Sequence, residues 1–435
     1  MIMKFLFVTI VSIVSSFVHA QQPEVLRINQ AVCHELSVRN SEDVKKQQNI
    51  LKQALLDKEI AFAHYLPDID GSVMSVLMKD TKITDGMSLQ MRGTYMAGIS
   101  LTLPIYAGGK ITTGNKLAEV GAEVKRIQQE QTRLQVICEA DKAYFSYLAV
   151  KSKVTMLEAY LLQMDSLLAM VKLSVDINMA TNNEMLRIEA KRSEIEYNLK
   201  KARNGVELCR MALCAALGLN LGTHFVTDET DIIIKDQLPL FSESPLSVRP
   251  EYQLLVQNIK AKELGIRNAR SGLLPTLAIS AQYSRYGWAY IKGEQQGYAY
   301  KNEISGNSPV LMATLSIPLW HWGKEIKSVK KAKLELANAQ LDMKKNARLL
   351  SIENQQALQN LQDSYSMIGT TCIGLSQAED NLHNMRLRYD NSMTTLTDLL
   401  DAYSQWQQAR SNHIEAQTQY KIYETEYLRL TGQIE

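Results

Sequence analysis

The sequence of 435 residues has little proline, and what it has is unevenly placed. Of its nine prolines, none lies between Pro104 and Pro239 and none follows Pro318. Proline-free runs of this length, rich in Ala, Leu, Glu, Lys, Gln and Met, favour very long helices. The composition therefore argues against a compact fold of short alternating helices and strands.

The sequence also lacks the motifs of catalysis and of metal or nucleotide binding. Its seven histidines form no H-E-x-x-H, and it has no dinucleotide fingerprint and no nucleophile elbow. A net charge of +2 without a basic block gives no electrostatic case for binding nucleic acid. We predict no enzyme, no cofactor, no metal and no nucleic-acid partner.

Cysteines are few, and their number is odd for an exported chain. They show no CxxC spacing, and we interpret them as buried small apolar residues: Cys33, Cys138, Cys209, Cys214 and Cys372.

The amino terminus has the pattern of a secretory signal. Lys4 precedes an apolar run at residues 5–14, and the small residue Ala20 ends the segment. We predict a cleaved signal peptide at residues 1–20. No cysteine follows directly, so lipidation is not expected, and no later run of about twenty apolar residues offers a helical anchor.

One short motif occurs twice, as "LPIYAGGK" at residues 103–110 and "IPLWHWGK" at residues 317–324. It is not a phosphate loop, because proline occupies the place of the first glycine and no Ser or Thr follows the lysine. Aligning Gly109 with Gly323 gives an offset of 214, which also pairs Asp176 with Asp390. One frame kept over such a distance indicates a tandem duplication.

Each repeat is predicted to hold a helix, two strands, a very long helix and, after a turn, a return helix. Around the motif, apolar residues alternate with small polar ones, typical of a half-solvated sheet or of a barrel with lipid outside and water inside. Four strands per chain are too few for a spanning barrel, so several chains must contribute. The predicted order is a first repeat at 21–218 (helix 29–64, strands 68–78 and 94–104, long helix 110–178, return helix 184–218), a linker at 219–249, and a second repeat at 250–435 (helix 250–272, strands 276–286 and 310–318, long helix 324–390, return helix 398–432).

The motif itself is predicted to join a strand to a long helix. Proline ends the strand, the glycines let the chain turn, and lysine opens a helix about 100 Å long. Such a rod must pack against a partner running back beside it. The aromatic residues are expected at a membrane interface, with core packing as the alternative; the junction residues are Pro104, Tyr106, Gly108, Gly109, Pro318, Trp320, Trp322 and Gly323.

With these motifs, "RPEYQLL" at 249–255 and "TDLLDA" at 397–402, the chain resembles the TolC family of outer-membrane channels. The resemblance implies a mainly α protein with a small β part, in which tandem-duplicated long-helix coiled coils carry four strands per chain. It implies a homotrimer that completes a 12-stranded β-barrel in outer-membrane lipid and an α-helical tunnel across the periplasm. It further implies a passive exit duct of a tripartite efflux pump or a type I secretion system. Its partners would be a periplasmic adaptor and an inner-membrane pump or secretion ATPase.

A structural or adhesive envelope protein is the alternative. Its coiled coils would form a stalk, and its loops at residues 79–93 and 287–309 would be exposed.

The resemblance places the functional site at two turns, residues 176–184 and 389–402. The family has a tyrosine and two aspartates there, and here these places hold Tyr389, Asp398 and Asp401. Rings of these aspartates would favour cations, with a raised pKa expected for one or more. Glu184 is the counterpart of Asp398 and is a candidate acceptor for Tyr389. Further tip residues are expected to dock the adaptor: Asp176, Asn178, Met179, Asn391, Ser392, Met393 and Thr394.

Helix capping is the competing interpretation of two of these carboxylates. Thr181-x-x-Glu184 and Thr395-x-x-Asp398 both have capping-box spacing. For Glu184 capping is favoured, whereas Asp401 lies beyond the cap.

The tip turns also depart from the family pattern. Where the family often has glycine, the chain has Asn178 and Ser392, of which Asn tolerates a left-handed conformation better. Thr394 replaces a basic latch residue, so we expect a tip held by fewer ionic bonds.

Overall fold

The structure is a computed structural model that describes residues 26–77, 90–91, 93–227, 229, 232, 234, 245–288, 291–295, 298–302 and 305–434. The predicted signal peptide, most of the loop at 79–93 and most of the linker at 228–244 lie outside the described residues. The chain forms two compact units, Met1–Val44, Arg133–Glu243 and Asn354–Glu435 in the first, Lys45–Thr132 and Ser244–Glu353 in the second. Each unit draws on both sequence repeats, because elements of the two repeats pack together.

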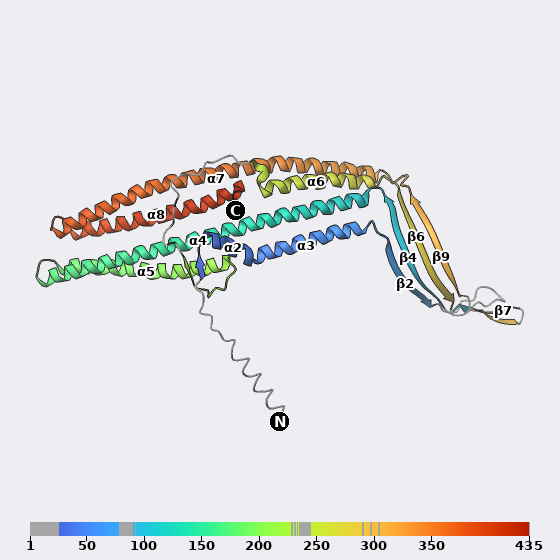
Figure 1. The fold of residues 1–435 in the computed structure, drawn as a ribbon, viewed down its shortest axis with the longest axis horizontal. Coiled ribbons are helices and arrows are strands. Elements are labelled where there is room, and N and C mark those ends of the chain that lie inside the picture. Colours follow the sequence, from blue (N-terminus) through green and yellow to red (C-terminus); the bar gives the residue numbers. More distant parts are fainter. Residues whose placement is uncertain are drawn as a thin grey trace, which may run out of the picture. The chain divides into compact units, whose positions relative to one another are not determined.

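The second unit contains a four-stranded antiparallel sheet in the order β2-β4-β6-β9 (Figure 1). One helix leads into or out of each strand. In chain order the elements are α3 (Glu42–Ala63), β2 (Asp68–Leu77), β4 (Gly93–Ala107), the start of α4 (Lys110–Asp176), α6 (Pro250–Ser271), β6 (Thr276–Trp288), β9 (Ser305–Ser316) and the start of α7 (Lys324–Asp390).

The strand register collects the apolar side chains on one face of the sheet. Directly paired residues of neighbouring strands point to the same face. One row across all four strands is Ile69, Leu101, Ala281 and Leu311. The next row, on the opposite face, is Asp70, Ser100, Gln282 and Val310. The alternation predicted for single strands therefore extends across the whole sheet.

Two strand predictions need correction. β4 does not end at Pro104 but continues to Ala107, with a register shift between Pro104 and Tyr106. The shift is a β-bulge, which accommodates the missing N–H of the proline without ending the strand. β9 begins at Ser305, five residues before the predicted start at 310, and ends before Pro318.

The prediction of only four strands is also incomplete. β1 (Leu26–Ile28) pairs in parallel with β5 (Phe225–Thr227), which lies in the predicted linker. A separate three-stranded sheet holds β3 (Gln90–Met91), β7 (Ile291–Gln295) and β8 (Tyr298–Asn302). Pieces of two to five residues are too short to show a reliable alternation, so main-chain pairing decides them.

Long helices dominate the first unit. α4 and α7 each have 67 residues, and their bounds differ by the sequence offset of 214. α5 (Asn182–Ala216) and α8 (Leu396–Thr431) return beside them. The remaining helices are α2 (Gln30–Asn40) and the 3₁₀ turn η1 (Leu246–Val248), which belongs to the second unit.

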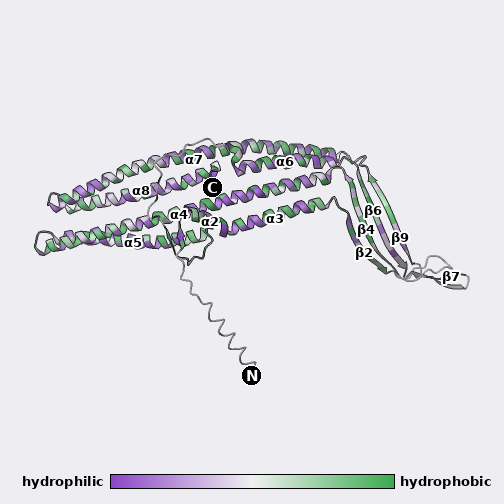
Figure 2. Cartoon of the chain, viewed as in Figure 1, coloured by the Kyte–Doolittle hydropathy of each residue, from purple (hydrophilic) through white to green (hydrophobic). Residues whose placement is uncertain are grey.

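The first unit has a core shared by α4, α5, α7 and α8. Tyr160 of α4 stacks on Tyr403 of α8 with ring centroids 5.6 Å apart, and both side chains are buried. Ile188 of α5 and Leu382 of α7 pack in the same cluster. A segment of α4 is long and apolar enough to span a membrane by composition, but the helix supplies this core and mixes polar with apolar residues along its length (Figure 2).

The five cysteines are all free, and their environments differ. Cys33 and Cys214 are buried, as predicted, and Cys138 and Cys209 are half-buried. Cys372 is exposed, so the prediction is wrong there. Burial raises the pKa of the Cys33 and Cys138 thiols to about 12, which keeps both protonated.

A buried carboxylate ties three helices of the first unit together. Asp141 of α4 is almost fully buried and lies 2.7 Å from His34 Nε2 of α2. It also accepts hydrogen bonds from Gln30 Nε2 at 3.1 Å and from Thr425 Oγ1 of α8 at 2.9 Å. Removing this acceptor leaves the buried Thr425 hydroxyl and two half-buried side chains without this partner, which costs more free energy than replacing donor and acceptor together.

We expect Asp141→Asn to destabilise the first unit by about 2 kcal/mol, since a neutral amide satisfies fewer of these donors. Thermal loss of helical circular dichroism in a neutral detergent measures the change. Asp165→Asn is the control, because the Asp165 side chain is 44% exposed where it pairs with Arg192, and solvent-accessible pairs contribute little. Equal melting of the two variants would show that the buried network is not stabilising.

Candidate functional site

The two tip hairpins are the candidate site. One is α4 and α5 joined by residues 177–181, and the other is α7 and α8 joined by residues 391–395. In the first turn Asn178 has φ 60°, and the N–H of Met179 donates to Ser174 O at 2.8 Å. In the second Ser392 has φ 59°, and the N–H of Met393 donates to Arg388 O at 2.7 Å.

Both turns are therefore Schellman motifs whose left-handed residue is not glycine. Asn178 and Ser392, the residues where the sequence analysis noted a departure from glycine, both adopt this left-handed conformation. The next residue of each turn, Met179 or Met393, is 81% or 77% exposed. The two tips thus present matching apolar side chains to solvent.

We expect Ser392→Gly to stabilise its hairpin by about 1 kcal/mol, because a left-handed non-glycine residue carries strain that glycine does not. Asn178→Gly should gain less, because Asn tolerates this conformation better. Melting of detergent-solubilised protein, followed by circular dichroism, compares the two. A larger gain at Asn178 than at Ser392 would contradict this explanation.

Capping boxes fix the two carboxylates that follow the turns. Glu184 accepts from the Thr181 N–H at 2.9 Å, while its own N–H donates to Thr181 Oγ1 at 3.3 Å. Asp398 and Thr395 repeat this arrangement, with 3.2 Å for each bond. The capping interpretation is confirmed for both residues.

Asp398 has a further neighbour in Thr394, whose Oγ1 donates to it at 3.0 Å. Hydrogen bonds from the Thr395 side chain and backbone, and then from Thr394, lower the pKa of the Asp398 carboxyl. In a single chain the pKa of Asp398 is therefore lowered, whereas a ring of aspartates in the assembly was expected to raise it. Thr394, which stands where the family has a basic residue, thus supports the carboxylate cap.

Tyr389 is half-buried beside the first tip. Burial, and then the nearby charges of Glu184 and Asp390, raise the pKa of its phenol. Within the described tip segments the Tyr389 hydroxyl makes no hydrogen bond to Glu184, because that carboxylate faces Thr181 instead. The candidate acceptor for Tyr389 is therefore already occupied by the cap.

Arg187 joins the two hairpins, and the sequence analysis missed it. Its Nη1 donates to Thr397 Oγ1 at 2.7 Å, across 210 residues of sequence. The offset of 214 between the repeats aligns Arg187 with Asp401, so a residue-by-residue comparison of the two tips could have singled out Arg187. Asp401 is exposed and makes no hydrogen bond or ion pair with the described residues. The two repeats thus carry opposite charges at one site of the tip.

The strand-to-helix junctions show the duplicated motif in three dimensions. Gly108 and Gly109 have φ 61° and 79°, and a Cβ on Gly108 would lie 2.6 Å from Ser271 O. The second junction uses Trp322 and Gly323, with φ 53° and 74°. Conformation and space both require glycine at the first junction, whereas the second accommodates tryptophan.

The aromatic residues of the second junction point into solvent. Trp320 and Trp322 are 73% and 84% exposed, and their rings meet edge to face with centroids 6.1 Å apart. Tyr106 of the first junction is 45% exposed. Core packing within one chain therefore does not explain the tryptophan pair.

The sheet has a second property that bears on function, the exposure of its apolar face. Ile69, Val73, Ile99, Leu311 and Leu315 are between 60% and 83% exposed. Strands that expose such a face, joined to paired long helices, are what a channel-forming outer-membrane protein requires of each chain.

The sequence match gives the family. The chain matches the outer membrane efflux protein family over residues 35–218 and 244–433, and it belongs to that family. This membership confirms the resemblance to TolC-type channels, the mainly α fold with a small β part, and an outer-membrane location. Such channels are passive, so the prediction that the chain is not an enzyme is also confirmed.

Solved structures agree with this assignment. CusC matches with a TM-score of 0.78 at 13% identity, covering 94% of this chain and 92% of that chain. The Campylobacter jejuni CmeC outer membrane channel matches with a TM-score of 0.75 at 18% identity, covering 93% and 87%. VceC from Vibrio cholerae matches with a TM-score of 0.75 at 15% identity, covering 93% and 96%. At these identities the likeness establishes the fold alone. A comparison with curated proteins found no match.

Proposed function

We propose that three copies of this chain form one 12-stranded barrel and one helical tunnel, a passive exit duct of a tripartite efflux pump or a type I secretion system. The observation that carries the proposal is the sheet, whose apolar face is exposed and whose outer strands β2 and β9 each have one edge that pairs with no strand among the described residues. Pairing β9 of one copy with β2 of the next removes every edge and turns the apolar face to lipid. Family membership favours this duct over the structural or adhesive envelope protein.

The tip hairpins are proposed to dock a periplasmic adaptor, which links the duct to an inner-membrane pump or secretion ATPase. Met179, Met393 and Ile177 support this role, since they are between 64% and 81% exposed at the turns. Exposed methionines pack adaptably against a partner. The polar residues beside them, Asp176 and Asn391, would frame the contact.

The same tips are proposed to narrow the periplasmic entrance. Asp398 and Asp401 would form acidic rings about the threefold axis, with Tyr389 and Glu184 behind them. Arg187 adds a bond between the hairpins that must break if they separate. Residues 1–20 would be removed on export, and the mature chain would carry no lipid.

Single-channel recording in a planar bilayer tests the duct. Protein purified in a neutral detergent, shown to be trimeric by light scattering, should give small cation-selective steps. Inserted trimers that never conduct would reject the proposal. Conductance from a monomeric preparation would reject the shared barrel.

A further inference from the structure

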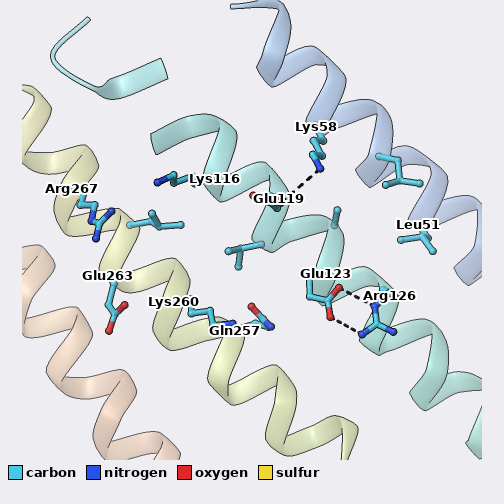
Figure 3. Close-up of a pocket in the computed structure, with 14 residues that line it drawn as sticks. Leu51, Lys58, Lys116, Glu119, Glu123, Arg126, Gln257, Lys260, Glu263 and Arg267 are labelled. Atoms are coloured by element: carbon cyan, nitrogen blue, oxygen red, sulfur yellow. Dashed lines mark hydrogen bonds and ion pairs between the residues drawn. The ribbon is translucent and has the colours of Figure 1, made fainter. Parts of the chain in front are cut away.

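The second unit contains a groove that the duct proposal does not use. It lies along α3, α4 and α6 and has a cavity volume of about 820 Å³, within the range of small-molecule sites (Figure 3). Its apolar lining comes from residues of all three helices: Leu51, Leu55, Val120, Ala122 and Leu264. Five basic and three acidic side chains complete it.

Part of this charge is neutralised inside the groove. Arg126 makes two hydrogen bonds to Glu123, at 2.9 and 2.7 Å. Lys58 lies 3.8 Å from Glu119, which is a weak pair between exposed groups. These two pairs leave three of the five cations to be accounted for.

Lys116, Lys260 and Arg267 are those three. Over the parts of the chain that the structure describes, none of them makes an ion pair or a hydrogen bond. Figure 3 shows Lys260 pointing from α6 toward α4, where Lys116 lies beside the same groove. Glu263 is the one lining carboxylate outside the two pairs. The groove therefore has an excess of positive charge above an apolar floor.

The sheet order indicates that the three cations lie away from the contacts between copies. They belong to α4 and α6, which continue the two inner strands β4 and β6, whereas copies would meet along the outer strands β2 and β9. α3, which also lines the groove, leads into β2. This step rests on the proposed trimer. At 1.5 Å per residue, Lys116 lies about 9 Å beyond the start of α4, and Lys260 lies about 16 Å before the end of α6. Arg267 is nearer to the sheet, about 6 Å before the end of α6, so the test below includes anionic lipid as a competitor.

We propose that the groove binds small amphipathic anions, molecules with an apolar ring body and one sulfonate or carboxylate. The apolar floor takes the ring body, and Lys116, Lys260 and Arg267 hold the anionic group. Neutral molecules of the same shape lack the attraction to the three basic side chains, and cations are repelled by them.

A matched pair of fluorescent probes tests the inference on the full-length trimer in a neutral detergent. 1-Anilinonaphthalene-8-sulfonate is the anionic probe, and N-phenyl-1-naphthylamine has the same ring body without the sulfonate. Fluorescence titration, with the detergent blank subtracted, should give saturable binding of the anionic probe. Lys116→Gln/Lys260→Gln/Arg267→Gln should weaken it about tenfold and leave the neutral probe within twofold.

The control removes the same charge elsewhere in the second unit. Lys344, Lys345 and Arg348 are exposed on α7 and do not line the groove, so Lys344→Gln/Lys345→Gln/Arg348→Gln should bind as the natural chain does. Equal weakening by both triple variants would reject the groove, and so would unchanged binding in the groove variant. Anionic vesicles that fail to displace the probe would support a solute, whereas displacement by them would reject it in favour of lipid. Conductance of the same trimers is recorded separately, so a duct that conducts but binds no probe rejects this inference alone.

Discussion

Arg187→Ala should increase the open fraction of the channel about a hundredfold. In each chain the Arg187 guanidinium holds the second tip hairpin through Thr397 Oγ1, at 2.7 Å. A solvent-exposed hydrogen bond of this kind contributes about 1 kcal/mol, and a trimer contains three copies. In the proposed entrance this bond belongs to the closed state, so losing about 3 kcal/mol from that state shifts a two-state equilibrium by about two orders of magnitude. Single-channel open probability measures the effect directly.

Two variants make this test specific to the bond between hairpins. Thr397→Val removes the acceptor with little change in shape, and combining it with Arg187→Ala should add almost nothing. Arg192→Ala is the matched control on the same helix, because Arg192 bonds Asp165 and Glu196 within the first hairpin. If Arg192→Ala opened the channel as much as Arg187→Ala, a general loosening of α5, and not the loss of the bond between the hairpins, would explain the effect.

The long helices and the tip turns could be predicted because their signals are local. Absence of proline and a constant offset of 214 mark α4 and α7, whose observed ends at Asp176 and Asp390 obey that offset. The spacing of Thr181 and Glu184 marks a helix start that depends on neighbouring residues alone. Such features need no knowledge of tertiary packing.

What could not be predicted depends on contacts between distant segments. The bond from Arg187 to Thr397 and the burial of Asp141 by residues of α2 and α8 follow from how the helices pack. The strand through Pro104 depends on a bulge that its partner β6 accommodates. β1 and β5 are three residues each, too short for a periodic signal, and pair across 199 residues of sequence between Leu26 and Phe225.

Asp398 should keep its influence on ion selectivity at a pH at which an ordinary carboxyl group is already protonated. It accepts hydrogen bonds from Thr395 and Thr394 that lower its pKa. A lowered pKa keeps the carboxylate charged as pH falls. The Asp401→Asn channel, which relies on Asp398, should therefore stay cation-selective as pH falls through the ordinary carboxyl range. Reversal potentials under a KCl gradient, measured across acidic pH, show where the selectivity is lost, and a loss within the ordinary carboxyl range would contradict the prediction.

The lowered pKa of Asp398 also determines how the stability of its hairpin depends on pH. The cap at Asp398 stabilises its hairpin above the ordinary carboxyl pKa, and this contribution disappears as pH falls through the lower folded-state value. Asp398→Ala should therefore melt earlier than the natural chain at neutral pH and converge with it in strong acid, while Asp401→Asn should melt like the natural chain throughout. The double variant Asp398→Asn/Asp401→Asn should lower the cation-to-anion permeability ratio about fivefold at neutral pH, since it removes six charges from the entrance of a trimer. Unchanged selectivity in the double variant, with trimers inserted and conducting, would confine these aspartates to capping and surface roles and move the selectivity of the duct away from its tip.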